Sequence, residues 1–292
     1  MKNLNFFNNA KRLLFVLIAF VFLGFNSSNK KIQSSDKPFF FIQLSDPQIG
    51  FADDKHFDVE TRNFETAVSE INILKPAFVV ITGDLVNDQT NNKEVNEFFR
   101  ILKMIDAKIP CHLVMGNHDV RGKPTLSTLE RAKDLFGKDH YSFIEGNWKF
   151  IVLNSTIIQQ PDSCKKIVEE QITWLKDELV QAKNPVIIFQ HHPMYIDKLD
   201  ETNQYHNMFL PQRQTYLDLF NQYHVKAIFT GHLHKNNVKK YNDIDLITTN
   251  ATSRSFGKDS AGMRIVKVYK DHFEHTFYPL KEMPTKVILE EK

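Results

Sequence analysis

Short apolar runs alternate with amphipathic segments from about residue 38 to near the end of the chain. The runs are rich in Val, Ile and Phe and nearly continuous, as expected for strands that are buried on both faces. Each run predicts one strand. The runs are FFFIQL (39–44), AFVVIT (77–82), CHLVM (111–115), KFIVLN (149–154), PVIIFQ (185–190), VKAIFT (225–230), DLITTN (245–250) and RIVKVY (264–269).

Three of the intervening segments carry apolar residues at helical spacing and therefore predict amphipathic helices. Their apolar positions are Phe64, Ala67, Val68, Ile71 and Leu74; Val95, Phe98, Phe99 and Leu102; and Ile172, Leu175 and Leu179. Pro76 and Pro110 are expected to end the first two helices and to open the next strands. This alternation of strand and helix predicts a largely parallel α/β architecture.

The N-terminal segment has a different pattern. Lys2, Lys11 and Arg12 precede an apolar run, LLFVLIAFVFLGF (13–25). Its length suits the apolar region of a signal peptide, whereas a helix that crosses a bilayer needs about 20 residues. We therefore expect residues 1–26 to be a signal peptide or an N-terminal anchor, 27–37 to be a polar linker, and 38–285 to form one domain. The expected location is periplasmic or extracellular, with a membrane tether if the leader is retained.

The composition is that of an ordinary globular protein, with 42% apolar and 25% charged residues. Lys and Arg number 37 against 35 Asp and Glu, so the net charge gives no reason to expect nucleic acid as a stable partner. Two cysteines, Cys111 and Cys164, are too few for a disulfide scaffold or a thiolate zinc site. Whether these two cysteines pair stays open at this point.

Polar side chains follow directly after five of the apolar runs. They are Asp46 and Gln48; Asp84; Asn117, His118 and Asp119; His191 and His192; and His232 and His234. An Asp or Asn after a strand is usually a turn or cap residue, but histidine is not a turn former. Because ligand sites in open α/β sheets lie at the carboxyl ends of strands, we expect these groups to meet at one edge.

The residue types in this set point to metal-assisted chemistry. Carboxylates, imidazoles and amides without a thiolate suit Mn, Fe, Zn or Mg rather than a structural zinc. The groups are too many for one ion. Two divalent ions about 3.5–4 Å apart can share a bridging carboxylate and a bridging hydroxide, an arrangement used for in-line attack on phosphorus. Asp84, a lone carboxylate on a Gly-Asp turn, is the expected bridge.

Five motifs in this order, DPQ, GDLVND, GNHD, HHP and GHLH, resemble the calcineurin-like metallophosphoesterase superfamily, over about residues 40–280. The stretches SDPQIGF, HYSF, VLNS and QHHP are most similar to the calcineurin-like phosphoesterase domain-containing proteins, whose eukaryotic members are described as serine/threonine phosphatases. The resemblance implies a four-layer α/β/β/α sandwich, in which two mixed β-sheets pack face to face with helices outside.

The resemblance also implies a role for each motif residue. One metal ion would be held by Asp46, Gln48, Asp84 and His234, and the other by Asp84, Asn117, His191 and His232. The family's ligand histidine stands two residues before the proline, which selects His191 over His192. His118 would act as general acid, or as a cation that stabilises the phosphoryl oxygens, and Asp119 would accept its other ring N–H.

Two positions depart from the wider superfamily pattern. Gln48 stands where the common first motif, Asp-x-His, has histidine. An amide oxygen is a harder ligand than imidazole, so we expect that site to prefer Mn²⁺, Mg²⁺ or Fe²⁺. For the two metal ions together, Mn or Fe is favoured. Asn87 stands where purple acid phosphatases have a tyrosine ligand, so no phenolate–iron colour is expected.

Three functions are compatible with these residues. The leading one is a dinuclear-metal phosphomonoesterase resembling phosphoprotein phosphatases, acting on a phosphorylated small molecule or phosphoprotein. The second is a phosphodiesterase or pyrophosphatase acting on nucleotides or ADP-ribose-type conjugates, and the third is a catalytically silent binding module. Residues 191–215 form the longest stretch without periodicity, where we look for substrate contacts. The candidate contacts are Tyr205, His206, Asn207, Arg213 and, after TTNATS, Arg254.

Overall fold

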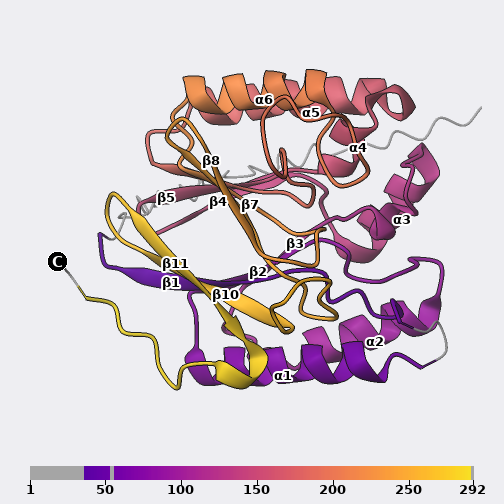
Figure 1. The fold of residues 1–292 in the computed structure, drawn as a ribbon, viewed down its shortest axis with the longest axis vertical. Coiled ribbons are helices and arrows are strands. Elements are labelled where there is room, and N and C mark those ends of the chain that lie inside the picture. Colours follow the sequence, from indigo (N-terminus) through magenta and orange to yellow (C-terminus); the bar gives the residue numbers. More distant parts are fainter. Residues whose placement is uncertain (1–35, 53–55, 291–292) are drawn as a thin grey trace, which may run out of the picture. The chain divides into compact units, whose positions relative to one another are not determined.

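Two β-sheets lie face to face in the computed structural model, with helices on their outer faces (Figure 1). The structure describes residues 36–52 and 56–290. The predicted leader, residues 1–26, lies outside the described residues, as does the predicted linker up to residue 35. Among the described residues, no helix is both long and apolar enough to cross a membrane.

The first sheet has the strand order β11-β10-β1-β2-β3. Strands β1, β2 and β3 are parallel to one another, and β3 lies at the edge of the sheet. Strand β10 runs antiparallel to β1, and β11, at the other edge, runs antiparallel to β10. The bounds are β1 Phe39–Leu44, β2 Phe78–Thr82, β3 Cys111–Val114, β10 Gly262–Val268 and β11 Phe273–Pro279.

The second sheet has the order β4-β5-β6-β7-β9-β8. Here β5, β6, β7 and β9 are parallel, and the edge strands β4 and β8 are antiparallel to their neighbours. The bounds are β4 Tyr141–Glu145, β5 Trp148–Val152, β6 Val186–Phe189, β7 Ala227–Thr230, β8 Asn237–Tyr241 and β9 Ile244–Thr248. The two mixed sheets implied by the resemblance are therefore confirmed. The parallel pairing predicted from the pattern holds for β1, β2 and β3 and for β5, β6, β7 and β9, but not for β10, an interior strand that is antiparallel to both of its neighbours.

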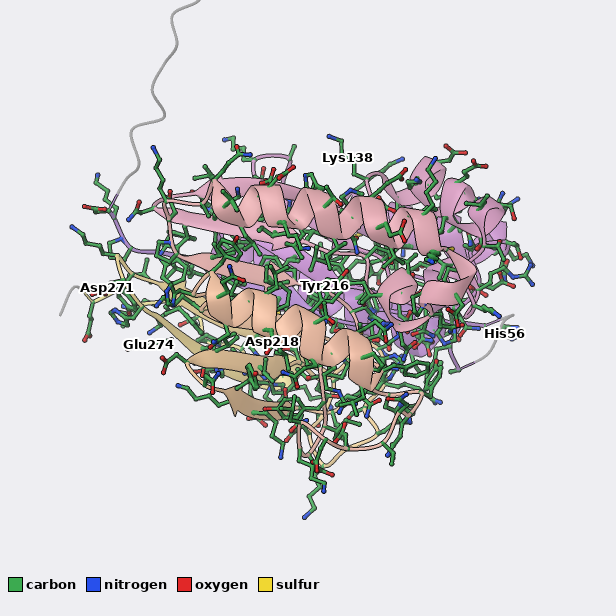
Figure 2. The ribbon with its side chains drawn as sticks, turned by 90° about the horizontal axis from the view of Figure 1, so that it is seen from above. His56, Lys138, Tyr216, Asp218, Asp271 and Glu274 are labelled. Atoms are coloured by element: carbon green, nitrogen blue, oxygen red, sulfur yellow. The ribbon has the colours of Figure 1, made fainter. Side chains whose placement is uncertain are left out.

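Two pairs of helices cover the outer faces of this sandwich. Helices α1 and α2 lie against the first sheet, and α5 and α6 lie against the second (Figure 1). Figure 2 shows α5 and α6 side by side on that face, with Tyr216 labelled between them. The bounds are α1 Asp58–Leu74, α2 Asn92–Leu102, α3 Leu126–Phe136, α4 Ser155–Gln159, α5 Lys165–Val180 and α6 Leu210–Gln222. Short 3-10 turns are η1 His118–Val120, η2 Pro161–Ser163 and η3 Leu280–Glu282.

The interface between the sheets is built around aromatic side chains from both. Phe41 of β1 stacks on Phe78 of β2 with ring centroids 4.7 Å apart. The rings of Phe150, Phe189 and Phe229 from the second sheet meet Phe41 edge-on at 5.6–5.8 Å. These contacts use the stacked and edge-to-face geometries that aromatic rings prefer, and they fix the two sheets against each other.

Two boundaries differ from those predicted by the sequence pattern, and three strands were not predicted. Helix α2 ends at Leu102, well before Pro110, so Pro110 opens β3 but does not end the helix. The aperiodic stretch after the histidine pair ends at Phe209, because α6 starts at Leu210 with a proline in its first turn. The edge strands β4, β8 and β11 were not predicted, because their residues are mostly half-buried or exposed and form no continuous apolar run.

Both cysteines are free thiols. Cys164 is buried at the start of α5, and Cys111 is partly buried in β3. The open question of a disulfide between them is therefore settled in favour of two unpaired residues.

Candidate metal centre

The turns after β1 and β2 lie side by side and carry three of the predicted ligands. The backbone N–H of Asp46 donates to the Gly83 carbonyl at 3.1 Å, and that of Gln48 donates to the Asp84 carbonyl at 2.8 Å. Parallel pairing thus continues beyond the strands and brings the side chains of Asp46, Gln48 and Asp84 to the same end of the first sheet.

The turns after β6 and β7 bring the histidines of the second sheet to the same place. The N–H of Gly231 donates to the His191 carbonyl at 3.0 Å, and the N–H of His232 donates to the Asp46 carboxylate at 3.0 Å. The predicted cluster therefore forms, but it joins the carboxyl ends of strands in two facing sheets, where the sequence analysis expected a single edge.

The potential donor atoms converge. The Nε2 atom of His191 lies 3.3 Å from Asp84 Oδ2, 3.1 Å from Asn117 Oδ1 and 3.1 Å from His232 Nδ1. The Nε2 atom of His234 lies 3.5 Å from Asp46 Oδ1. Such crowding of buried carboxylates and imidazoles is typical of a cation site that holds its ligands together.

One buried oxygen gives a direct test of whether these residues fit metal ions. Gln48 Oε1 is buried and has no hydrogen-bond partner among the described residues, while its amide Nε2 lies 3.4 Å from Asn87 Oδ1. Leaving a buried polar atom unpaired costs free energy, and a cation would satisfy it. Gln48 Oε1 therefore fits a cation, which the nearby carboxylate of Asp46 and the ring of His234 would also hold. Asn117, His191 and His232 would hold a second cation.

Backbone carbonyl groups orient the four histidine rings of the site. A carbonyl only accepts a hydrogen bond, so the ring nitrogen facing it carries the proton and the other nitrogen is left for a cation or substrate. The pairs are His191 Nδ1 with Thr82 at 2.8 Å, His232 Nε2 with Tyr205 at 3.1 Å, His234 Nδ1 with Arg254 at 2.7 Å, and His118 Nδ1 with Asn87 at 3.0 Å.

Backbone conformation marks the same residues. Nine non-glycine residues of the described chain have a positive φ, and five of them are predicted ligands. These five are Asp46 (49°), Gln48 (33°), Asp84 (48°), His232 (72°) and His234 (48°). The left-handed region costs a residue with a side chain about 1–3 kcal/mol, and such strain tends to gather at functional sites.

Glycine is required at one of these turns for steric reasons. A Cβ atom at Gly116 would lie 2.2 Å from the backbone N and from Oδ1 of Asp84. Because glycine has no side chain, the turn that carries Asn117 can approach the Asp84 carboxylate closely. The backbone N–H of His118 then donates to Asp84 Oδ1 at 2.9 Å.

The charges of the site partly neutralise one another. Burial alone would raise the pKa of Asp84, but His191 and the other nearby histidines outweigh it and hold that pKa well below its usual range. Burial lowers the pKa of His191, but the carboxylate of Asp84 outweighs it and raises the pKa to about 9. Burial, and then repulsion by His191, lowers the pKa of His232 to about 3. A cation bound to His191 would have to displace its proton.

The predicted hydrogen bond between His118 and Asp119 is wrong. The ring Nδ1 of His118 faces the Asn87 carbonyl, while the buried Asp119 carboxylate accepts from the backbone N–H groups of Gly116 at 2.8 Å and Leu85 at 2.9 Å. Burial, together with the charge of Asp84, raises the pKa of Asp119 to about 8. Asp119 therefore ties together the two turns that carry Asp84 and Asn117, and the tautomer of His118 is set by a main-chain group.

His192 lies behind the cluster. Its Nδ1 is 2.9 Å from Ser155 Oγ, and its Nε2 is buried without a partner among the described residues. A ring nitrogen of His192 comes within 4.8 Å of ring nitrogens of His191 and His232. The contacts of His191 with Asp84 and Asn117 are what favour His191 as the ligand of the pair.

The candidate substrate contacts fall into two groups. Tyr205, His206 and Arg254 are exposed, and Tyr205 touches the site, because its hydroxyl accepts from Asn117 Nδ2 at 2.7 Å and its ring lies 4.9 Å from that of His232. Asn207 and Arg213 are fully buried and donate to groups of the same loop, Asn207 to Glu201 and Arg213 to Met208. These two side chains shape the loop and do not face the site.

Two aromatic residues at the site were not predicted. Phe256 is 68% exposed yet stacks on His234, with ring centroids 4.7 Å apart, and Phe51 packs on both. Phe51 follows the DPQ motif by three residues, so its position in the sequence was a usable signal. Phe256 lies far along the chain, two residues after Arg254, a predicted substrate contact, but nothing in the sequence indicated that its ring stacks on His234.

This arrangement suits transfer of a phosphoryl group to water. Two divalent ions bound here would activate water and neutralise charge that develops on a phosphoryl group. His118 has Nδ1 held by the Asn87 carbonyl and an Nε2 without a partner in residues 36–52 and 56–290, so it can donate a proton or a hydrogen bond to an oxygen of such a group.

Comparisons with known proteins agree with this chemistry. The sequence model of the calcineurin-like phosphoesterase family matches residues 41–236. The chain is 33% identical over 276 residues to the serine/threonine-protein phosphatase CPPED1 of Rattus norvegicus, with 88% of each chain covered. It is 27% identical over 152 residues to a probable cyclic nucleotide phosphodiesterase of Fibrobacter succinogenes, with 52% of this chain and 56% of that protein covered.

Solved structures support the fold. The purple acid phosphatase PPD1 of yellow lupin (Lupinus luteus) superimposes with a TM-score of 0.65 at 13% identity, covering 84% of this chain and 52% of that one. The family match, the similarity to a phosphatase over 88% of both chains, and the observed sandwich together establish the family of this chain. The chain belongs to the calcineurin-like phosphoesterase family and is a metal-dependent phosphoester hydrolase.

Proposed function

We propose that the protein is a phosphomonoesterase that removes phosphate from phosphorylated serine or threonine side chains. The observation that carries this proposal is the similarity to serine/threonine-protein phosphatase CPPED1, which extends over 88% of both chains. The similarity to probable cyclic nucleotide phosphodiesterases is weaker, at 26–27% identity over 52–75% of this chain. It makes hydrolysis of nucleotide diesters, or of pyrophosphates such as ADP-ribose, the second candidate function.

Membership of the family implies two divalent metal ions, and we assign their ligands from the geometry of the centre. One ion is assigned to Asp46, Gln48, Asp84 and His234, and the other to Asp84, Asn117, His191 and His232. The unpaired amide oxygen of Gln48 supports Mn or Fe as the favoured metal, because an amide is a harder donor than imidazole.

The residues around the ions have separate roles in this proposal. His118 is the general acid, with its Nδ1–H held by the Asn87 carbonyl so that Nε2–H points away to donate to the leaving oxygen. Asp119 is a positioning residue for the turns of Asp84 and Asn117. We propose that the exposed side chains of Tyr205, His206 and Arg254 contact the substrate, as the sequence predicted.

We also propose that the protein is exported, on the basis of the charged and apolar pattern of residues 1–26. Fractionation of cells that express the full chain, with N-terminal sequencing of the product, tests this. Recovery of the intact chain in the cytosol would contradict export, and recovery in the membrane fraction would identify an uncleaved anchor.

A substrate panel distinguishes the candidate functions. Protein reconstituted with Mn²⁺ is assayed on a phosphoserine peptide, p-nitrophenyl phosphate, bis-p-nitrophenyl phosphate and ADP-ribose. We expect the two monoesters to be hydrolysed faster. Activity confined to the diester or to ADP-ribose would overturn the monoesterase proposal.

A variant tests the assignment of His118. His118→Ala should reduce kcat by about 10²–10⁴-fold, the usual contribution of general acid catalysis, while it keeps both metal ions. Metal content is measured by elemental analysis. His272→Ala, which changes an exposed histidine stacked on Tyr269, is the matched control and should behave as wild type. Unchanged turnover in His118→Ala would reject the assignment.

A further inference from the structure

A pocket of about 480 Å³ opens between segments that also build the metal centre. Its volume falls in the range that holds small ligands or a few residues of a peptide. Four segments line it: the turn after η1 (Lys123), the end of α4 with η2 (Gln159 to Asp162), the loop before α6 (Asn203 and Phe209), and the first turn of α6 (Pro211 and Gln212).

One backbone carbonyl links the wall of this pocket to the metal centre. The side-chain N–H of Gln159 donates to the carbonyl of Tyr205 at 2.9 Å, and His232 Nε2 faces the same carbonyl at 3.1 Å. The pocket wall therefore lies two hydrogen bonds from a predicted metal ligand. Lys123, which also lines the pocket, follows His118 by five residues in the sequence.

The wall presents amide groups that the protein leaves unused. The side chains of Gln160 and Gln212 have no hydrogen-bond partner in the part of the chain that the structure describes. Asn203 uses its oxygen to accept from the N–H of Leu210 at 2.7 Å, and its NH₂ group has no partner among the residues that the structure describes. Each free primary amide can both donate and accept, so the wall matches a ligand that carries both kinds of group.

The charge of the wall is balanced. Lys123 is its single cation and Asp162 its single anion. Sites for a second phosphate use several cations or a bidentate arginine, so this pocket is not suited to one. Phe209, Pro161 and Pro211 supply apolar surface between the amides.

We propose that this pocket binds the peptide chain next to the phosphorylated residue, with Gln160, Gln212 and Asn203 pairing with peptide N–H and C=O groups. An uncharged backbone with alternating donors and acceptors and small apolar side chains has the chemistry that the wall matches. This inference rests on the proposed phosphoprotein phosphatase function, and it adds the site that distinguishes a peptide from a small phosphate ester.

The test compares a phosphoserine peptide of seven residues with p-nitrophenyl phosphate, which has no peptide backbone to pair with the amides of the pocket. The double variant Gln160→Ala/Gln212→Ala should raise KM for the peptide about 10-fold, the effect of losing one or two neutral hydrogen bonds. It should leave kcat for the peptide and both constants for p-nitrophenyl phosphate unchanged. Thermal denaturation of the variant should match wild type, since neither amide bonds to the protein.

The matched control is Gln214→Ala, on the same helix but outside the pocket, where the amide donates to Asp218. It should leave KM for the peptide unchanged. A peptide KM that is unaffected in the double variant overturns the pocket assignment, as does an equal loss with p-nitrophenyl phosphate. A KM increase seen with a nucleoside monophosphate but not with the peptide overturns it in favour of a nucleobase site.

Failure of the proposed function has a different signature. In that case the wild-type protein hydrolyses diesters but neither the peptide nor p-nitrophenyl phosphate. If wild type does hydrolyse the peptide, and the double variant does so with the same KM, then the function stands and only the pocket assignment fails.

Discussion

Tyr205 contacts two predicted ligands of one metal ion in two different ways. Its hydroxyl oxygen accepts from Asn117 Nδ2 at 2.7 Å, and its backbone carbonyl faces His232 Nε2 at 3.1 Å. The first contact selects which end of the Asn117 amide turns toward His191, and the second selects the tautomer of His232. A loop residue thereby sets the orientation of both ligands.

Tyr205→Phe separates these two effects, because it removes the hydroxyl and keeps the carbonyl. We expect one of the two ions to bind about 10–100-fold more weakly, the usual effect of losing a group that orients a ligand. Calorimetric titration of metal-free protein with Mn²⁺ measures this. Tyr223→Phe, a partly buried tyrosine at the end of α6, is the control. If Tyr205→Phe binds both ions with the same affinities as wild type, then Asn117 does not need the Tyr205 hydroxyl to orient it.

At this scale the sequence revealed the donor atoms but not what orients them. The imidazoles and carboxylates were recognisable because histidine at several strand ends has no structural explanation. Their partners are main-chain carbonyls of Thr82, Tyr205, Arg254 and Asn87, and every residue has a carbonyl. The wrong pairing of His118 with Asp119 was implied by the resemblance, because carboxylates often orient the histidines of a metal site. In the structure the Asp119 carboxylate instead accepts from the backbone N–H groups of Gly116 and Leu85.

Among the secondary-structure elements, β1 places an aromatic side chain, Phe41, at the junction of the two sheets. Phe41 is fully buried and touches aromatic rings from one strand of its own sheet and three of the other. Because the surrounding strands cannot collapse into the space it fills, its removal leaves a cavity between the sheets.

Phe41→Ala should therefore destabilise the protein by about 3–5 kcal/mol, the range for a buried phenylalanine. Urea denaturation followed by far-UV circular dichroism measures the change in the free energy of unfolding. Ile73→Ala on α1, where the side chain is 57% exposed, should change it by less than about 0.5 kcal/mol. A similar small change for Phe41→Ala would mean that the sheets repack.

The sequence pattern predicted interior strands well and edge strands poorly. A strand buried on both faces, such as β2 or β6, reads as one apolar run. The edge strand β8, NVKKY, has no fully buried residue and three charged or amide side chains, so only its pairing with β9 makes it a strand. Pairing with a neighbour is a tertiary contact, which periodicity along one segment does not contain.

For the whole molecule, the metal centre is a second junction between the sheets. The predicted ligands Asp46, Asp84 and Asn117 follow strands of the first sheet, whereas His191, His232 and His234 follow strands of the second. Ions that bind both sets stabilise the packed arrangement over any state in which the sheets separate.

Metal removal should therefore lower the stability of the whole fold. Saturation at 100 times the dissociation constant contributes about 2.7 kcal/mol per ion, so we expect Mn²⁺ to raise Tm and a chelator to reverse the increase. Calorimetric scans with and without Mn²⁺ measure this shift. Asp84→Asn, which removes the carboxylate shared by both sites, should show a much smaller shift. A full shift in that variant would place the ions elsewhere.

Stability should also fall in mild acid for a reason unrelated to the metals. His112 of β3 stacks on Phe143 with ring centroids 3.6 Å apart, and burial lowers its pKa to about 4. In the unfolded chain the pKa of this histidine is about 6.5. At pH values between about 4 and 6.5 the unfolded chain therefore binds more protons than the folded protein. The contribution of His112 to the free energy of unfolding is full above about pH 6.5 and declines toward about pH 4.

His112→Phe isolates this contribution. With a reduction for partial exposure, wild type should lose about 1 kcal/mol more than the variant between pH 7 and pH 5. Urea denaturation of both metal-free proteins at the two pH values measures the difference. Parallel losses in the two proteins would show that His112 does not titrate in this range.

The left-handed backbone at five of the predicted ligands also constrains how this chain can vary. At each of these positions a residue must supply a donor atom and also tolerate a conformation that most side chains resist. Glycine would relieve the backbone strain but has no side-chain atom that can bind a metal ion. Selection for thermostability and selection for turnover would therefore favour different residues at these five positions. Directed evolution that selects for folding alone should therefore replace these predicted ligands before other residues.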